Sequence, residues 1–217
     1  MFSGCQFSLY PMSDNFVEVI LPAVEAMGTS PELRIETDDI STLVVGTPSN
    51  VFAAVERAYG AACRAGGHVV LSALFSRGCP GEPDDPLCTP QGPESATAEP
   101  VARAPGSAER QRAGIAIDAQ FSIYPLGIEN YMNSIAAGID SVKQAGVFDR
   151  SKHFCTRLHG DIRDVFAAVE KTFSTAARET GHVVIHLTAS KGSPSAKKAS
   201  SHATHETTTH DQEKNHV

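Results

Sequence analysis

The sequence has no tryptophan, no excess of basic residues and no apolar run of the ~18 residues that a membrane-spanning helix needs. Lys and Arg number 18 in the 217-residue chain against 25 Asp and Glu, a formal net charge of −7. Nucleic-acid-binding proteins carry a basic face, so this balance argues against such a partner. The first residues lack the basic segment and apolar stretch of a secretory signal. We therefore expect a soluble protein that is not embedded in a membrane.

Cysteine is sparse as well, and its arrangement does not suggest a disulfide framework. The five cysteines are an odd number, and no two of them form a CxxC pair. Such cysteines are typical of reduced thiols, so we expect a cytoplasmic location. The sequence also contains neither a GxGxxG loop nor a phosphate-binding P-loop.

An enzyme is one alternative class, and few residues favour it. His182 and His186 would share one face of a strand, but no carboxylate or cysteine completes a metal site with them. Cys79 and Cys155 are the candidate nucleophiles, and the sequence shows no histidine base for either. We therefore expect no catalytic residues, no metal site and no cofactor.

The residues that are present are distributed unevenly. Six of the 13 prolines fall between positions 82 and 113, a stretch without aromatic residues. The end of the chain is also free of aromatics and rich in Ser, Thr, Lys and His. We interpret residues 82–116 as a linker and 196–217 as a disordered tail. The remaining segments, 4–81 and 117–195, are each near the lower size limit for an independent core.

An internal repeat organises the chain. The segment CQFSLYP at 5–11 returns as AQFSIYP at 119–125, an offset of 114 residues. VFAAVE at 51–56 and GHVV at 67–70 return at the same offset. Three blocks in one order and at one spacing identify a tandem duplication.

Each copy predicts the element order β-α-β-β-α-β. Apolar residues alternate around Phe7 and Leu9, which is typical of a strand. A helical stripe follows, made of Phe16, Val17, Ile20, Leu21 and Val24, with Tyr131 and Met132 in the second copy. The segment 33–46 divides into two strands around Asp38 and Asp39, and Thr47-Pro48 opens a second helix. The sequence therefore predicts an α+β fold, a tandem repeat of two ferredoxin-like sandwiches with antiparallel sheets and helices on one face.

The face of the sheet turned away from the helices would carry neutral polar side chains. Its expected members are Gln6, Ser8, Tyr10, His68, Ser72 and Ser76, and in the second copy Gln120, Ser122, Tyr124, His182, His186, Thr188 and Ser190. A fully solvated face would carry Lys and Glu, so we expect partial burial. Either the two sheets pack together or dimerise through these faces, or the faces line a small-molecule pocket.

Three segments resemble a known family. QFSLYPM at 6–12, TDDIST at 37–42 and FSRGCPG at 75–81 are similar to segments of the YkoF-like thiamin/hydroxymethylpyrimidine-binding proteins of bacteria. The likeness extends over both repeats. It implies a homodimer of tandem ferredoxin-like repeats that binds thiamin or its pyrimidine precursor, without known catalysis, in vitamin uptake or salvage. A vitamin transporter component is a further possible partner.

The candidate ligand-binding residues combine amide, hydroxyl, carboxylate and aromatic groups. An aminopyrimidine pairs a ring acceptor with an amine donor, which one glutamine amide can match; a tyrosine can stack on the ring, and a carboxylate attracts the thiazolium cation. The candidates are Gln6, Ser8, Tyr10, Asp38, Asp39, Thr42, Ser76, Gly78, Cys79, Gln120, Ser122, Tyr124, His153, Thr156, Ser190 and Gly192. Tyr10 could instead be a core-edge aromatic, and Asp38-Asp39 only a turn.

The two copies differ at these positions. The offset of 114 places Lys152 and His153 opposite Asp38 and Asp39. We therefore expect the second site to prefer a neutral pyrimidine, or to bind thiamin more weakly than the first. A regulatory or scaffolding module without a ligand stays open as an alternative, because a fold alone does not determine function.

Overall fold

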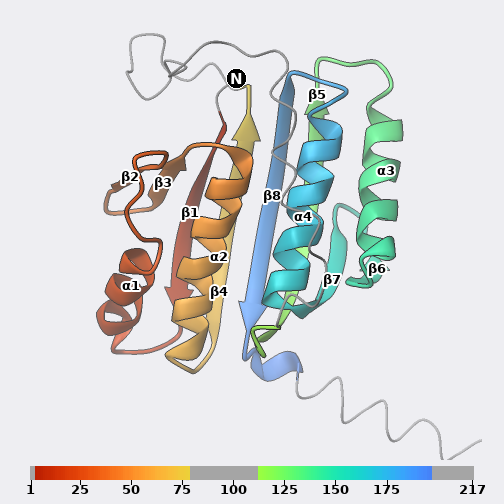
Figure 1. The fold of residues 1–217 in the computed structure, drawn as a ribbon. Coiled ribbons are helices and arrows are strands. Elements are labelled where there is room, and N and C mark those ends of the chain that lie inside the picture. The colour runs from red at the N-terminus through yellow and green to blue at the C-terminus, as the bar shows by residue number, and fades with distance from the viewer. Residues whose placement is uncertain (1–2, 79–111, 197–217) are drawn as a thin grey trace, which may run out of the picture.

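The computed structural model describes residues 3–78 and 112–196, and the first of these ranges forms one complete repeat. Its elements are β1 (Ser3–Pro11), α1 (Phe16–Glu25), β2 (Arg34–Thr37), β3 (Thr42–Val45), α2 (Pro48–Arg64) and β4 (Val69–Arg77). The predicted order β-α-β-β-α-β is confirmed, as is the division of 33–46 into two strands (Figure 1).

The second repeat has the same order. Its elements are β5 (Ala116–Leu126), α3 (Tyr131–Gln144), β6 (Phe148–Ser151), β7 (Thr156–Asp161), α4 (Ile162–Ala176) and β8 (His182–Lys191). The hairpin pairs Thr37↔Thr42 and Ser151↔Thr156 lie at the 114-residue offset, so the two repeats agree in register. The predicted linker and tail fall outside the described residues, apart from residues 112–116 and 196.

Helix boundaries follow local chemistry. Thr47 is the N-cap of α2, with Pro48 in the first turn, as the sequence predicts. The chain leaves that helix through Gly66 and Gly67, whose φ angles of 96° and 75° suit glycine. Asp161 caps α4.

The eight strands form one continuous antiparallel sheet in the order β2-β3-β1-β4-β8-β5-β7-β6. The repeats join edge to edge, because β4 pairs with β8 from Val69↔Lys191 to Arg77↔Val183 (Figure 1). The expectation that the two sheets of one chain might pack face to face is therefore wrong. Each repeat has a free edge at its fourth strand, and pairing these edges satisfies backbone donors and acceptors of both.

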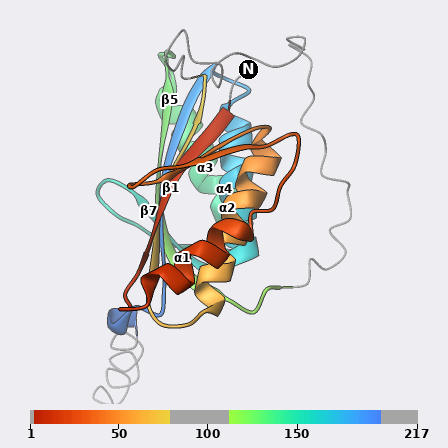
Figure 2. The same cartoon turned by 90° about the vertical axis from the view of Figure 1, so that its left-hand side faces the viewer.

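All four of these helices cover the same face of the sheet (Figure 2). The core between helices and sheet is shared by the repeats: Phe52 on α2 stacks on Phe75 of β4 at 3.9 Å between ring centroids and meets Phe173 of α4 edge-on at 5.6 Å. Tyr59 and Phe166 make the corresponding contact at 6.5 Å. Each repeat was predicted from its length to have only a marginal core, and in the structure the two repeats share one hydrophobic core.

The predicted apolar stripe of α1 is only partly buried. Ala23, which is outside the predicted stripe, is the one fully buried residue of α1, whereas Phe16, Val17 and Leu21 are each about half exposed. In α3, Tyr131 and Met132 are exposed in the same way. These helices lie toward the two edges of the sheet, where no further helix or strand of the described residues covers their outer sides (Figure 1).

We expect Asp161→Ala to lower the free energy of unfolding by about 1–2 kcal/mol, in the range for loss of an N-cap. Its carboxylate accepts hydrogen bonds from the backbone N–H groups of Arg163, Ala113, Gly114 and Ile115. Burial raises the pKa of Asp161, but these four donors outweigh it and the pKa is lowered. The contribution of Asp161 to the free energy of unfolding should therefore be complete above the ordinary aspartate pKa of about 3.9. It should be lost as pH falls through the lowered pKa of Asp161.

Urea unfolding at several pH values measures this effect. Thr47→Ala is the matched control, because the Thr47 hydroxyl accepts one long hydrogen bond of 3.4 Å from the Asn50 N–H. An Asp161→Ala cost no larger than that of Thr47→Ala would show that the contacts to residues 113–115 add nothing.

Candidate functional site

In each repeat, one edge of the central strand is paired over only part of its length. β3 pairs with β1 only from Gly4 to Phe7, so residues 8–11 have no strand on that side within residues 3–78 and 112–196. β7 pairs with β5 only as far as Phe121, which leaves residues 122–126 in the same position. In each repeat the hairpin loop, 38–41 or 152–155, lies beside this unpaired edge. Unpaired strand edges present free backbone donors and acceptors.

The first loop is held in shape by Asp38. Its carboxylate accepts hydrogen bonds from the backbone N–H groups of Ile40 (2.8 Å) and Ser41 (2.7 Å). Its own N–H donates to the carbonyl of Ser41 at 3.0 Å. These hydrogen bonds to Ile40 and Ser41 hold the pKa of Asp38 below its ordinary value, so the carboxylate is charged near neutral pH.

Two side chains of β1 fix this loop against the strand. The Ser8 hydroxyl donates to the carbonyl of Ile40 at 2.8 Å, and the Gln6 amide nitrogen donates to the Ser41 hydroxyl at 2.9 Å. A hollow of about 130 Å³ lies between the loop, β1 and α1. Its lining includes Ser8, Ile20, Val24, Thr37, Asp38, Asp39, Ile40, Ser41 and Thr42.

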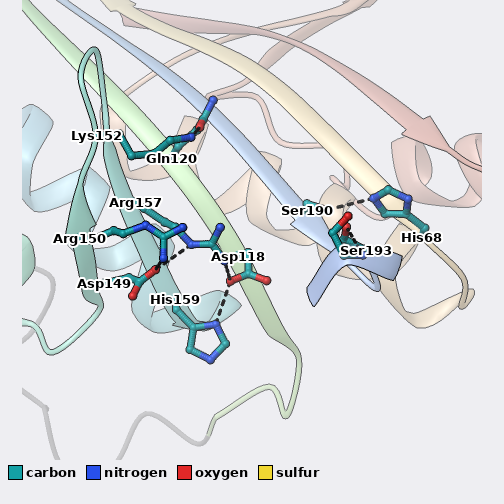
Figure 3. A network of polar contacts seen from close by, with 11 residues as sticks. His68, Asp118, Gln120, Asp149, Arg150, Lys152, Arg157, His159, Ser190 and Ser193 are labelled. Atoms are coloured by element: carbon teal, nitrogen blue, oxygen red, sulfur yellow. Dashed lines mark hydrogen bonds and ion pairs between the residues drawn. The ribbon is translucent and has the colours of Figure 1, made fainter. Parts of the chain in front are cut away.

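The second repeat reproduces the loop with different side chains. The Ser122 hydroxyl donates to the carbonyl of Phe154 at 2.8 Å, which is the Ser8 contact moved by 114 residues. The ammonium of Lys152 donates to Gln120 Oε1 at 2.9 Å (Figure 3). The hollow here is wider and more open, and its lining residues are Gln120, Ser151, Lys152, His153, Phe154 and Cys155.

Exposed apolar side chains surround both hollows, and sequence reasoning missed the most exposed of them. Ile40 and Phe154, at the two loop tips, are 77% and 92% exposed. Tyr10 and Tyr124, predicted to stack on a ligand, are each about half exposed on the open face of the sheet. The sequence signal for Ile40 and Phe154 was that each is an apolar residue at the same position of an otherwise polar turn.

The candidate residues divide into two groups. Ser8, Asp38 and Asp39 line the first hollow, and Gln120 and His153 line the second. Gln6 and Ser122 do not line the hollows but contact the adjoining loops, at the Ser41 hydroxyl and the Phe154 carbonyl. Thr42 and Thr156 are buried and pair with Phe7 and Phe121, so they lie on the helix side of the sheet. Thr42 still lines the first hollow, and its hydroxyl contacts that of Thr37.

The remaining candidates among the described residues lie away from the hollows, along the β4–β8 seam. Ser76 is on β4, and Ser190 on β8 contacts His68 Nε2 at 3.1 Å (Figure 3). Gly78 and Gly192 follow these two strands and pack closely against the opposite repeat. Cys79 lies outside the described residues.

An ion-pair network that the sequence did not predict covers the open face of the second repeat. Arg157 bridges Asp118 and Asp149, each at 2.7 Å, and His159 Nδ1 lies 3.1 Å from Asp118 (Figure 3). The corresponding first-repeat positions are Leu43, Gly4, Ile35 and Val45, none of which ionises. The network is therefore particular to the second repeat.

With this geometry in place, comparison with known proteins identifies the family. A sequence model of the YKOF-related family matches residues 2–82 and 116–196, one repeat each. The chain belongs to this family. It is also 33% identical over 197 residues to "Putative HMP/thiamine-binding protein YkoF" of Bacillus subtilis (strain 168), covering 90% of this chain and 92% of that protein. The predicted resemblance to the YkoF-related family is thus confirmed.

None of the helices in 3–78 and 112–196 is long and apolar enough to cross a membrane. Within the same residues, no three His, Cys, Asp or Glu side chains are grouped so that they could hold a metal ion.

Proposed function

We propose that this protein binds thiamin or its hydroxymethylpyrimidine precursor, one molecule at each hollow, and that it does so without catalysis. The observation that carries the proposal is the duplicated site, in which a glutamine and a serine of the central strand meet a hairpin loop beside an unpaired strand edge. The name of the Bacillus subtilis relative, which refers to HMP and thiamine, supports the choice of ligand.

The first hollow suits the cationic ligand. Gln6 uses its amide nitrogen on Ser41, which leaves Oε1 able to accept from an exocyclic amine. Asp39 and the ionised Asp38 line the same hollow and attract a thiazolium cation. Tyr10 offers a half-exposed ring on the adjacent strand for stacking.

The wider role that we propose is vitamin uptake or salvage in the cytoplasm, as a homodimer that could serve a vitamin transporter. The open face of the sheet supports the dimer, because it carries neutral polar residues together with Tyr10, Leu74 and Tyr124, which are each nearly half exposed. Pairing two such faces would bury these side chains.

Calorimetric titration with thiamin and with hydroxymethylpyrimidine tests the proposal. Gln6→Leu and Gln120→Leu should each weaken one of two sites about tenfold, since an unpaired polar group in a binding site costs about 1–3 kcal/mol. Gln144→Leu, at the exposed end of α3, is the matched control and should leave both sites unchanged. The absence of saturable heat with either compound would overturn the proposal.

The second candidate function is a regulatory or scaffolding module without a small-molecule ligand. The exposed loop tips Ile40 and Phe154 favour it, because exposed apolar residues are common where proteins meet. The same titration separates the two functions, because a scaffold would bind neither compound.

A further inference from the structure

The two hairpin loops occupy equivalent places but carry opposite charge. Positions 36, 38 and 39 are Glu, Asp and Asp, whereas 150, 152 and 153 are Arg, Lys and His. The equivalence rests on structure, because the pairs Glu36↔Leu43 and Arg150↔Arg157 differ by 114 residues at both members. Ser8 and Ser122 also hold the same loop carbonyl. The reversal of charge therefore occurs at structurally equivalent positions of the two repeats.

The side-chain amides of Gln6 and Gln120 are oriented in opposite senses, in keeping with the opposite charges of the two loops. Gln6 donates its nitrogen to Ser41, so its oxygen has no hydrogen-bond partner among the described residues. Gln120 accepts from Lys152 at 2.9 Å, and more weakly from the Cys155 thiol at 3.5 Å, through Oε1. Its nitrogen is the group without a partner in that part of the chain. The first loop thus presents carboxylates, with the amide acceptor of Gln6 beside it, whereas the second hollow offers N–H donors and an ammonium group.

Nearby carboxylates do not neutralise Lys152. Asp118 and Asp149 are both engaged by Arg157, at 2.7 Å each (Figure 3). The Lys152 ammonium contacts a neutral amide and forms no ion pair within residues 3–78 and 112–196. Its charge is therefore available to a ligand beside Gln120.

We infer that the second hollow binds an anionic form of the ligand, a phosphate monoester of its hydroxyl group. This inference rests on the proposed function and names the ligand class of one of its two sites. The hydroxymethyl group of the pyrimidine, like the hydroxyethyl group of thiamin, can carry a phosphate. Lys152 would meet the phosphate oxygens in charge-assisted hydrogen bonds, and the free amide nitrogen of Gln120 would donate to the same group or to the ring. The acidic first hollow disfavours this form and keeps the unphosphorylated ligand.

Calorimetry with four probes tests the inference: hydroxymethylpyrimidine, its monophosphate, thiamin monophosphate and inorganic phosphate. Lys152→Gln should weaken binding of the two phosphate esters about tenfold, the lower end of what a charged hydrogen bond contributes. Binding of unphosphorylated hydroxymethylpyrimidine should change by less than about twofold, because no charge meets Lys152. Raising the salt concentration should weaken the esters selectively.

Lys171→Gln, an exposed lysine on α4, is the matched control and should leave every titration unchanged. Lys152 is itself exposed, so both variants should fold, and their melting curves verify this. Equal effects of the two variants, esters that bind no more tightly to the second site than the unphosphorylated compound, or inorganic phosphate that binds as tightly as the esters would each overturn the inference. In these cases, saturable binding of hydroxymethylpyrimidine would leave the proposed function standing.

Discussion

Gly78→Ala should lower the free energy of unfolding by about 2–4 kcal/mol, because it combines backbone strain with a collision at the seam between the repeats. Gly78 has a φ of 79°, a conformation that L side chains rarely adopt. A Cβ added there would overlap the carbonyl oxygen of Gly181, at the start of β8. Backbone cannot move aside as a flexible side chain can, so the β4–β8 pairing would have to shift.

Gly127→Ala separates the cost of backbone strain from the cost of the collision at the seam. Gly127 has nearly the same φ, 75°, but nothing lies within 4 Å of an added Cβ. Its cost should be the strain alone, about 1–2 kcal/mol. Chemical unfolding followed by far-UV circular dichroism measures both variants. Equal losses would mean that the close approach to Gly181 does not constrain the seam.

The same close approach occurs on the other side of the seam. Gly192 has a φ of 76°, and an added Cβ would overlap the carbonyl oxygen of Gly67. The last strand of each repeat is therefore followed by a glycine that packs against a residue just before the last strand of the other repeat. Both glycines were predicted as ligand-binding residues, and the seam provides a packing reason for glycine at these positions.

The fold of each repeat could be predicted because its signals are local. Alternation around Phe7 and the Thr47-Pro48 helix start each depend on a few neighbouring residues, and the 114-residue repeat presents such signals twice. The pairing of β4 with β8 could not be predicted, because a strand that pairs on both edges has the same alternation as an edge strand. The exposed outer side of α1 was missed for a related reason, since periodicity identifies an apolar stripe but not whether anything covers it.

The site was predictable in its residue types but not in its contacts. Gln6, Ser8 and Asp38 were identified as polar residues on a strand face and in a turn, and the structure joins them through the loop carbonyl of Ile40 and the hydroxyl of Ser41. The sequence also showed the exchange of Asp38 for Lys152. It could not show that this exchange turns the neighbouring glutamine amide, because amide orientation depends on the partner that the fold provides.

Duplication explains why one chain can carry two different sites. The serine that holds the loop is the same in both repeats, so the anchoring of the loop to the central strand is retained. The charged positions lie on the exposed loop, where substitution costs little stability. Ligand preference can therefore diverge between the repeats while the sheet and the shared core stay the same.

The second large loss of stability is expected for a substitution in the core that the two repeats share. Phe52→Ala should lower the free energy of unfolding by about 3–5 kcal/mol, the usual range for removal of a buried phenylalanine side chain. Phe52 is 2% exposed and touches aromatic rings of both repeats, Phe75 at 3.9 Å and Phe173 at 5.6 Å between centroids. Because the cavity would open between α2 and α4, both repeats should lose stability together.

Differential scanning calorimetry checks this prediction, with Phe148→Ala as the matched control. Phe148, on the edge strand β6, is only partly buried and lies within one repeat, so its loss should cost about 1–2 kcal/mol. Each variant should unfold in one transition at a lowered temperature, since the repeats share a sheet and a core. Two separate transitions, of which Phe52→Ala shifts only one, would show that the repeats fold independently despite the β4–β8 seam.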